Sequence, residues 1–117
     1  MPAQHHRSPA ASERRLDLIL HALSDRTRRR LLKRLSAGPA MVGDLARPFD
    51  MTRVAVSKHL RVLEKAQLIS RSIEGRVHRC ALRAAPLREV ERWLMDYRAF
   101  WSETLEALAR YAESNHE

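Results

Sequence analysis

Five polar or cationic side chains between residues 52 and 61 are spaced so that they share the outer face of a helix. They are Thr52, Arg53, Ser57, Lys58 and Arg61. The planar guanidinium of arginine forms paired hydrogen bonds with phosphates and with guanine edges, and short polar side chains near a helix N-terminus can reach bases. Val56, Leu60 and Leu63 lie four and three residues apart and predict the buried face of the same helix. The pattern predicts a helix that presents a nucleic-acid-binding face to solvent.

Positive charge is concentrated in the first part of the 117-residue chain, whose net charge is +8. Residues 1–85 contain 18 Lys/Arg and 7 Asp/Glu, a net charge of +11, whereas residues 86–117 contain 4 and 7, a net charge of −3. Of the 22 cationic side chains, 19 are arginine. This asymmetry favours a body that binds a polyanion, followed by a separate acidic segment. A solvated arginine-rich surface is the alternative.

Composition excludes several classes of protein. One cysteine excludes a disulfide framework and a multi-cysteine zinc site. No apolar run approaches the roughly 20 residues that cross a bilayer, and the N-terminal stretch lacks the apolar segment of a secretory signal. We therefore expect one cytoplasmic domain with no membrane contact, preceded by a disordered tail at residues 1–11.

His78 and Cys80 lie two residues apart on a predicted strand and face the same side of it. A cysteine–histidine pair can act in nucleophilic catalysis, but no third group or oxyanion hole accompanies this one, so we expect no enzymatic activity. Arg76 and Arg79 could lower the pKa of the Cys80 thiol and make it redox-active, whereas a buried apolar side chain is the simpler interpretation. We expect His59, inside the helix at 53–66, to hydrogen-bond locally rather than to contact a base or sense pH.

The spacing of hydrophobic residues, together with the residues that start or end helices and turns, predicts the remaining helices and strands. Ser12, Ser24 and Thr52 are candidate N-caps, and along the second helix Arg28, Arg29, Lys33 and Arg34 are expected to face solvent. Strand-like runs at 69–73 and 77–82 flank Gly75, which supplies the positive φ of a tight turn. The helices are predicted at residues 12–23, 25–38, 41–47, 53–66 and 86–113.

The short helix at 41–47, a tight turn and the helix at 53–66 form a helix-turn-helix. A basic hairpin follows, and Arg76 at its tip is expected to contact a phosphate. The predicted fold is therefore mainly α with a small β-hairpin wing, a winged helix-turn-helix. The domain spans 12–113, with the helix-turn-helix at 41–66, the wing at 69–82 and a dimerisation helix at 86–113. A small helical bundle with a surface hairpin is the alternative.

Large apolar residues recur at three-four spacing along the last predicted helix, as in a coiled-coil seam. We assign this seam to a homodimer interface formed by Leu87, Val90, Leu94, Tyr97, Trp101 and Leu108. The aromatic residues Trp93, Tyr97, Phe100 and Trp101 could instead line a ligand pocket between subunits, but a dimer core is the favoured interpretation.

Four segments together resemble the ArsR family of bacterial winged-helix repressors. They are ALSDRTRRRLLKRL (22–35), MVGDLARPFDMTRVAVSKHLRVLEKAQLI (41–69), EGRVHRCAL (74–82) and PLREVERWLMDYRAFWSETLEALARY (86–111). The most specific stretch is Val56-Ser57-Lys58-His59-Leu60 followed by Leu63. The resemblance covers residues 16–113 and implies a homodimer that binds a palindromic operator in double-stranded DNA and leaves it on sensing a signal. It also implies a recognition helix at 52–65 and a wing at 69–82.

Three positions depart from the family pattern. Arg26 stands where the family usually has proline, Gln67 where it has glycine, and Cys80 where it has an aromatic residue. Glycine at that second position closes the recognition helix, so we expect Gln67 to adopt the left-handed conformation there.

By the resemblance, a metal-binding member of the family would have either a Cys-x-Cys pair in the first helix of the helix-turn-helix or a cluster of Asp, His and Glu on the last helix. Here residues 40–45 contain no cysteine, and the last helix has no histidine before His116. We therefore expect no metal site and no cofactor, and we assign no effector.

Together the sequence predicts a homodimeric, DNA-binding transcriptional repressor. One alternative is a metal- or small-ligand-responsive regulator with an unrecognised sensor site. Another is an adaptor that binds a partner protein through its last helix and whose basic face is incidental.

Overall fold

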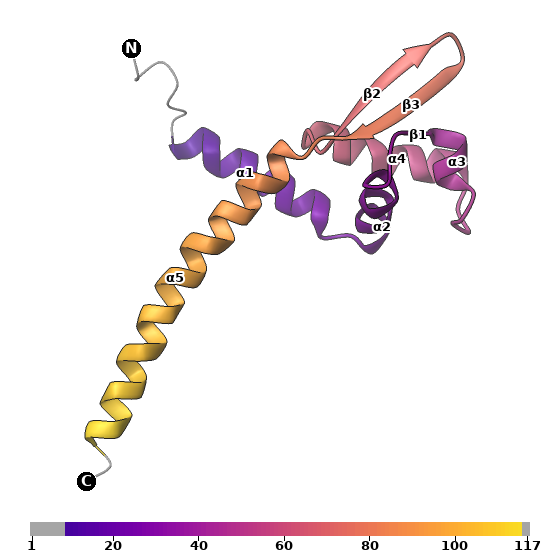
Figure 1. The fold of residues 1–117 in the computed structure, drawn as a ribbon. Helices are drawn as coiled ribbons and strands as arrows, with labels where there is room; N and C mark the ends of the chain where they lie inside the picture. The colour runs from indigo at the N-terminus through magenta and orange to yellow at the C-terminus, as the bar shows by residue number, and fades with distance from the viewer. Residues whose placement is uncertain (1–8, 116–117) are drawn as a thin grey trace, which may run out of the picture.

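A computed structural model describes residues 9–115, and the order of elements within them is that of a winged helix-turn-helix (Figure 1). The fold class predicted from the sequence is thus confirmed. The elements are α1 (Pro9–Leu23), α2 (Arg26–Leu35), β1 (Ala40–Met41), α3 (Val42–Ala46), α4 (Arg53–Lys65), β2 (Ile69–Glu74), β3 (Val77–Leu82) and α5 (Ala85–Ser114).

The core lies where the apolar faces of α1 to α4 meet the base of the sheet. Side chains with no measurable exposure come from each part: Ile19, Leu31, Leu45, Leu60 and Cys80. Burying a leucine or isoleucine contributes about 1.5–3 kcal/mol. The small core therefore holds the helix-turn-helix and the sheet base as one unit.

The junction between α1 and α2 differs from the sequence-based prediction in two ways. Helix α1 begins at Pro9, three residues before Ser12, so residues 9–11 of the predicted tail are helical while residues 1–8 lie outside the described part. Asp25 rather than Ser24 caps α2, because its carboxylate accepts the backbone N–H of Arg28 at 3.0 Å. The Ser24 hydroxyl instead donates to the His21 carbonyl at 2.6 Å.

Arg28 was expected to face solvent, and that expectation is wrong. Its side chain is buried, with Nε donating to the Ala22 carbonyl at 2.8 Å and Nη2 to the His21 carbonyl at 3.0 Å. The last carbonyls of a helix have no partner within the helix, and a cation satisfies them well. Arg28, in the first turn of α2, therefore caps the C-terminal end of α1.

Helix α4 has a defined start and end. The Thr52 hydroxyl accepts the backbone N–H of Ala55 at 3.1 Å and caps the first turn. At the other end Gln67 has a φ of 60°, its N–H donates to the Glu64 carbonyl, and the Leu68 N–H donates to the Leu63 carbonyl at 3.0 Å. This is the paired bonding of a Schellman motif, and Gln67 takes the left-handed conformation expected of it.

The wing is a three-stranded antiparallel sheet in the order β1-β3-β2. The hairpin of β2 and β3 pairs Arg71 with Cys80 and turns through Gly75, whose φ is 61°. Strand β1 pairs Ala40 with Cys80 on the other side and was not predicted, because two residues are too short to show a strand period. Through β1, the sheet is tied to the start of α3.

Helix α5 projects away from the body of the molecule (Figure 1). Pro86 is buried and Leu87 and Val90 pack against the core, but nearly every side chain from Glu91 to Asn115 is exposed. The radius of gyration is 19.9 Å, whereas a compact chain of this length has about 13 Å. No described helix is long and apolar enough to span a membrane.

Candidate nucleic-acid interface

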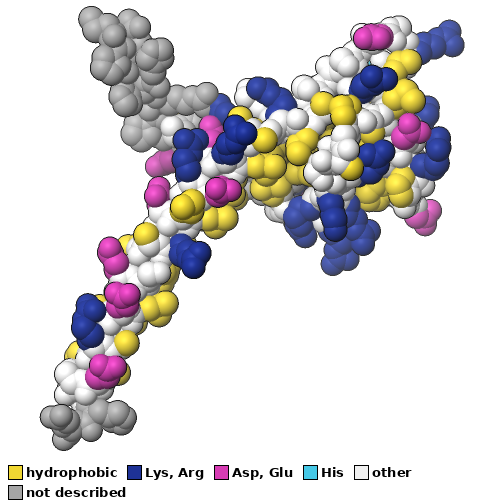
Figure 2. All heavy atoms as spheres, in the orientation of Figure 1, with side chains coloured by type: hydrophobic (Ala, Val, Ile, Leu, Met, Phe, Trp, Pro, Cys, Tyr) yellow, Lys and Arg dark blue, Asp and Glu magenta, His cyan; other side chains and the backbone are white. Residues whose placement is uncertain are grey.

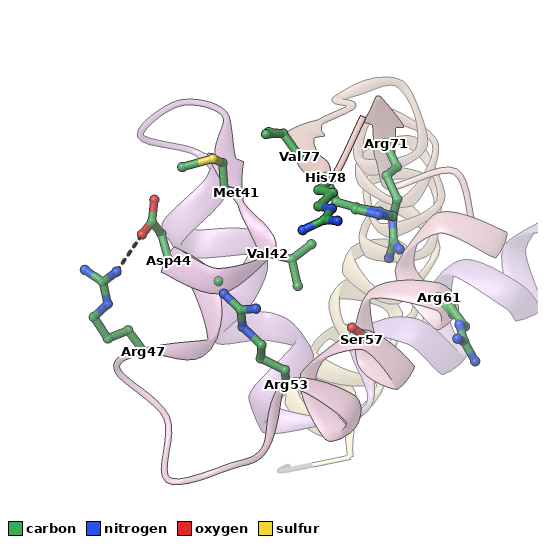
Figure 3. A pocket seen from close by; sticks show the side chains of 12 residues that line it. Met41, Val42, Asp44, Arg47, Arg53, Ser57, Arg61, Arg71, Val77 and His78 are labelled. Atoms are coloured by element: carbon green, nitrogen blue, oxygen red, sulfur yellow. Dashed lines mark ion pairs between the residues drawn. The ribbon is translucent and has the colours of Figure 1, made fainter. Parts of the chain in front are cut away.

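A groove of about 520 Å³ runs between α3, α4 and the wing (Figure 3). Helix α4 forms one wall with Arg53, Ser57 and Arg61, spaced four residues apart on one face. The remaining lining residues come from the α3 region and the wing: Met41, Val42, Gly43, Asp44, Arg47, Arg71, Arg76, Val77 and His78.

The groove is strongly cationic. Five arginines line it, and Asp44 is the only acidic residue among its lining side chains. The carboxylate of Asp44 is already paired with Arg47, with Oδ1 3.1 Å from Nη2. A cleft with one sign of charge raises the local concentration of oppositely charged ligands. The groove is therefore built to attract a polyanion, and blue side chains cover much of the body in Figure 2.

Arg53 lies across the face of α3. Figure 3 shows its side chain rising from α4 toward α3, where its guanidinium occupies the space that a Cβ at Gly43 would need. A side chain at position 43 would collide with Nη2 of Arg53. The absence of a side chain at Gly43 therefore sets the direction in which Arg53 points.

The groove brings together four of the six residues that the sequence suggested for DNA contact: Arg53, Ser57, Arg61 and Arg76. Thr52 and Lys58 are exposed but do not line it, and the Thr52 hydroxyl is engaged in capping α4. Arg47 and Arg71 were not among those six. Period-two alternation from the buried Ile69 places Arg71 on the inner face of β2, and that signal was present in the sequence.

His59 lies on the inner side of α4, away from the groove lining. Its Nδ1 is 3.3 Å from Nη1 of Arg28 and 3.8 Å from Oδ2 of Asp25, and its side chain is half-buried. The expected local hydrogen bonding is confirmed. This contact ties α4 to the start of α2.

The pKa of the Asp25 carboxyl is lowered from its usual value. The main cause is the hydrogen bond from the backbone N–H of Arg28; burial acts in the opposite direction, and the charges of His59 and Arg28 lower the pKa further. The carboxylate therefore stays ionised at the helix N-terminus, where negative charge is favourable.

Cys80 is fully buried at the centre of the sheet base. Burial raises the pKa of its thiol, and this outweighs the opposite effect of the Arg71 guanidinium on the paired strand. A raised pKa and no solvent contact disfavour the thiolate that redox chemistry requires. The suggestion that Arg76 and Arg79 activate Cys80 is thus wrong, and the buried-side-chain interpretation holds.

The predicted apolar seam of α5 falls into two parts. Leu87 and Val90 are half-buried against the core of their own chain. Four residues further along are 43–58% exposed and form the outer stripe: Leu94, Tyr97, Trp101 and Leu108. Yellow side chains follow α5 in Figure 2.

Aromatic rings stiffen the outer stripe. Trp93 stacks on Tyr97 with centroids 5.5 Å apart, and Trp101 meets Tyr97 edge-on at 5.9 Å.

Within residues 9–115, no three His, Cys, Asp or Glu side chains gather where they could hold a metal ion.

Comparison with known proteins points to one family. A family model described as a helix-turn-helix domain matches residues 23–71. The HTH-type transcriptional regulator Rv2034 of Mycobacterium tuberculosis is 49% identical over 53 residues, which are 45% of this chain and only 50% of that protein. The chain thus aligns with about half the length of this relative.

Two further relatives are matched over most of their length. The transcriptional repressor SdpR of Bacillus subtilis is 30% identical over 79 residues, covering 68% of this chain and 88% of that protein. The crystal structure of an ArsR family transcriptional regulator superposes with a TM-score of 0.75 at 42% identity, covering 77% of this chain and 93% of that one. These relatives are transcriptional regulators and not enzymes. With its winged helix-turn-helix and cationic groove, the chain belongs to the ArsR family of DNA-binding transcriptional regulators.

Proposed function

We propose that the protein is a homodimeric transcriptional repressor that occupies a palindromic operator in double-stranded DNA. The observation that carries this proposal is the cationic groove between α4 and the wing. An α-helix fits the major groove of B-DNA, and flanking cations neutralise phosphates. Repression is supported by the similarity to a transcriptional repressor of Bacillus subtilis.

A homodimer is supported by the outer stripe. Large apolar side chains standing in a row on an exposed helix mark an interaction surface. A two-fold dimer presents two copies of α4, which matches a palindromic site with half-sites about one helical turn apart.

Within each half-site we assign different roles to two pairs of residues. Arg53 and Ser57, near the N-terminus of α4, contact bases, whereas Arg61 and Arg76 contact phosphates. Thr52 and Lys58 flank the same face of α4. A bidentate contact to a base is worth about 1–3 kcal/mol of discrimination, while a phosphate contact strengthens binding to all sequences alike.

Footprinting on DNA upstream of the protein's own coding sequence tests the proposal. A repressor protects a palindrome there, whereas an adaptor or a ligand-dependent protein lacking operator affinity leaves that DNA unprotected. The protected duplex and a scrambled duplex are then titrated at several salt concentrations with the wild type, Arg53→Ala and Arg76→Ala.

Arg53→Ala is expected to lower the ratio of specific to non-specific affinity, which corresponds to a loss of about 1–3 kcal/mol of binding free-energy difference in each half-site. Arg76→Ala is expected to leave that ratio nearly intact and to reduce the salt slope by about one for each phosphate that is no longer neutralised. If Arg76→Ala removed sequence preference while Arg53→Ala kept it, the wing would read the sequence and this docking would be wrong.

A further inference from the structure

We propose that Arg71 is a phosphate-binding residue whose guanidinium leaves a loose contact with Glu64 to grip the DNA backbone inside the groove. This inference rests on the proposed function, because it names the part of the DNA that the inner wall of the groove holds.

Arg71 is an incompletely satisfied cation. Its side chain is 14% exposed, and Nε and Nη2 are buried without a nitrogen or oxygen partner among the described residues; the Cys80 thiol, a weak acceptor, is the side chain that interacts with the guanidinium across the strand pair. The Glu64 carboxylate, on α4, is the nearest opposite charge, with Oε2 3.9 Å from Nε. That separation gives Coulomb attraction but is too long for a hydrogen bond.

The unpartnered nitrogens form a binding edge. Nε and Nη2 lie on the same side of a guanidinium and are the pair that binds both oxygens of an anionic group at once. A buried donor without an acceptor is unfavourable, so the side chain gives up little hydrogen-bond energy when it moves. In the free protein, this edge therefore lacks an anionic partner, and Arg71 has to move toward the groove before an anion can bind it.

The groove offers the place where that anion binds. Arg71 already lines it and points from the wing toward α4 (Figure 3), and Arg61, Arg76 and His78 line the same groove. The one acidic lining residue, Asp44, is held by Arg47, so it does not supply the missing acceptor. The phosphodiester carries two anionic oxygens and repeats along DNA whatever the sequence. A backbone phosphate fits this edge in charge and in geometry.

Glu64 has a defined part in this proposal. Its carboxylate attracts Arg71 away from the groove, and because it is itself part-exposed it can return to water when Arg71 moves. Contact with DNA thus exchanges a loose ion pair for a bidentate one. Because Arg71 belongs to β2, the same exchange fixes the wing against the DNA backbone.

The test compares Arg71→Met with Arg79→Met in the full-length protein. Arg79 is the matched control because it is an exposed arginine on β3 that does not line the groove. We expect Arg71→Met to lower the slope of log Kobs against log salt by about one per protomer and to weaken operator and scrambled DNA by the same factor. Equal slopes for the two variants would overturn the proposal.

Unfolding of the DNA-free protein in urea separates binding from a structural role. Since the partners of Arg71 in the free protein are the Glu64 carboxylate at 3.9 Å and the weakly accepting Cys80 thiol, Arg71→Met should unfold at the same or a higher urea concentration than the wild type. A lower midpoint together with an unchanged salt slope would make Arg71 a structural residue.

A double-mutant cycle tests the exchange with Glu64. We expect Glu64→Gln to strengthen DNA binding more in the wild type than in the Arg71→Met background. Equal gains in both backgrounds would show that Glu64 only repels DNA and would overturn the exchange.

Inorganic phosphate, added to the DNA-free protein at constant ionic strength, distinguishes the two sources of the ligand. Saturable binding that Arg71→Met abolishes, with no change in the DNA salt slope, would assign the site to a free anion instead. A wild type that protects no palindrome would refute the proposed function, whereas equal Arg71→Met and Arg79→Met slopes on a protected palindrome would refute only this inference.

Discussion

Gln67 is the one non-glycine residue within 9–115 that adopts a positive φ, and it does so where α4 ends. A Cβ is strained in this conformation, whereas glycine is not. We expect Gln67→Gly to raise the free energy of unfolding by about 0.5–1 kcal/mol, measured by urea unfolding at a fixed protomer concentration. Gln67→Ala keeps the Cβ and serves as the control, with little change expected. A destabilised glycine variant would contradict the strain argument.

Asp25 confers a pH dependence with a defined sign. Its pKa is lower in the folded protein than in the unfolded chain, so its stabilising contribution is present above the unfolded value and disappears as pH falls through the folded value. We expect acid unfolding below about pH 4 to include this contribution. Asparagine at a helix N-cap keeps the acceptor but not the charge. The free energy of unfolding of Asp25→Asn should therefore depend less on pH in this window.

Asp25→Ala separates the charge of that residue from its cap. It removes the acceptor for the Arg28 N–H as well, and we expect a loss of about 1 kcal/mol at pH 7 in thermal or urea unfolding. An Asp25→Asn variant with the acid-unfolding profile of the wild type would show that the charge contributes nothing.

At the scale of elements, the contact between α3 and α4 sets the direction of the side chain of Arg53, which we propose contacts a base. A methyl group at position 43 would occupy the space of the Arg53 guanidinium. The end of an arginine can move, so we expect Gly43→Ala to change stability by less than about 1 kcal/mol. We expect it to lower the specific-to-non-specific binding ratio in the same direction as Arg53→Ala. In the Arg53→Ala background the glycine substitution should have no further effect, and additive losses would contradict this link.

Much of this element order is predictable from sequence because each helix carries a clear three-four period and each turn carries Gly, Pro or a cap. Arg28 was misplaced because its carbonyl partners belong to another helix end, which periodicity does not reveal. Four groove residues were predictable from the faces of α4 and the wing tip. The alternation along β2 predicts the inward position of Arg71, but the contribution of α3 to the groove depends on how the wing packs over α4, and that is a long-range contact.

At the scale of the whole molecule, the proposed homodimer places the outer stripe of α5 in its interface. We expect Leu94→Glu combined with Trp101→Glu to give monomers with little specific DNA binding, because two charges would be buried in an apolar interface. Sedimentation at micromolar concentration measures the state directly. Ala99→Glu lies on the opposite face of the same helix and should remain dimeric. A double variant that stays dimeric would remove α5 from the interface.

The length of α5 also converts small angles into large displacements. Its 30 residues form a rod about 45 Å long, joined to α1 near its base by the Arg15–Glu89 ion pair at 2.8 Å. A tilt of about 5° at that joint moves the far end by about 3 Å, close to the roughly 3.4 Å rise of one base pair. In the proposed homodimer, tolerance for inserted or deleted base pairs between half-sites is therefore governed by the rigidity of the α1–α5 joint, which lies outside the DNA-facing groove.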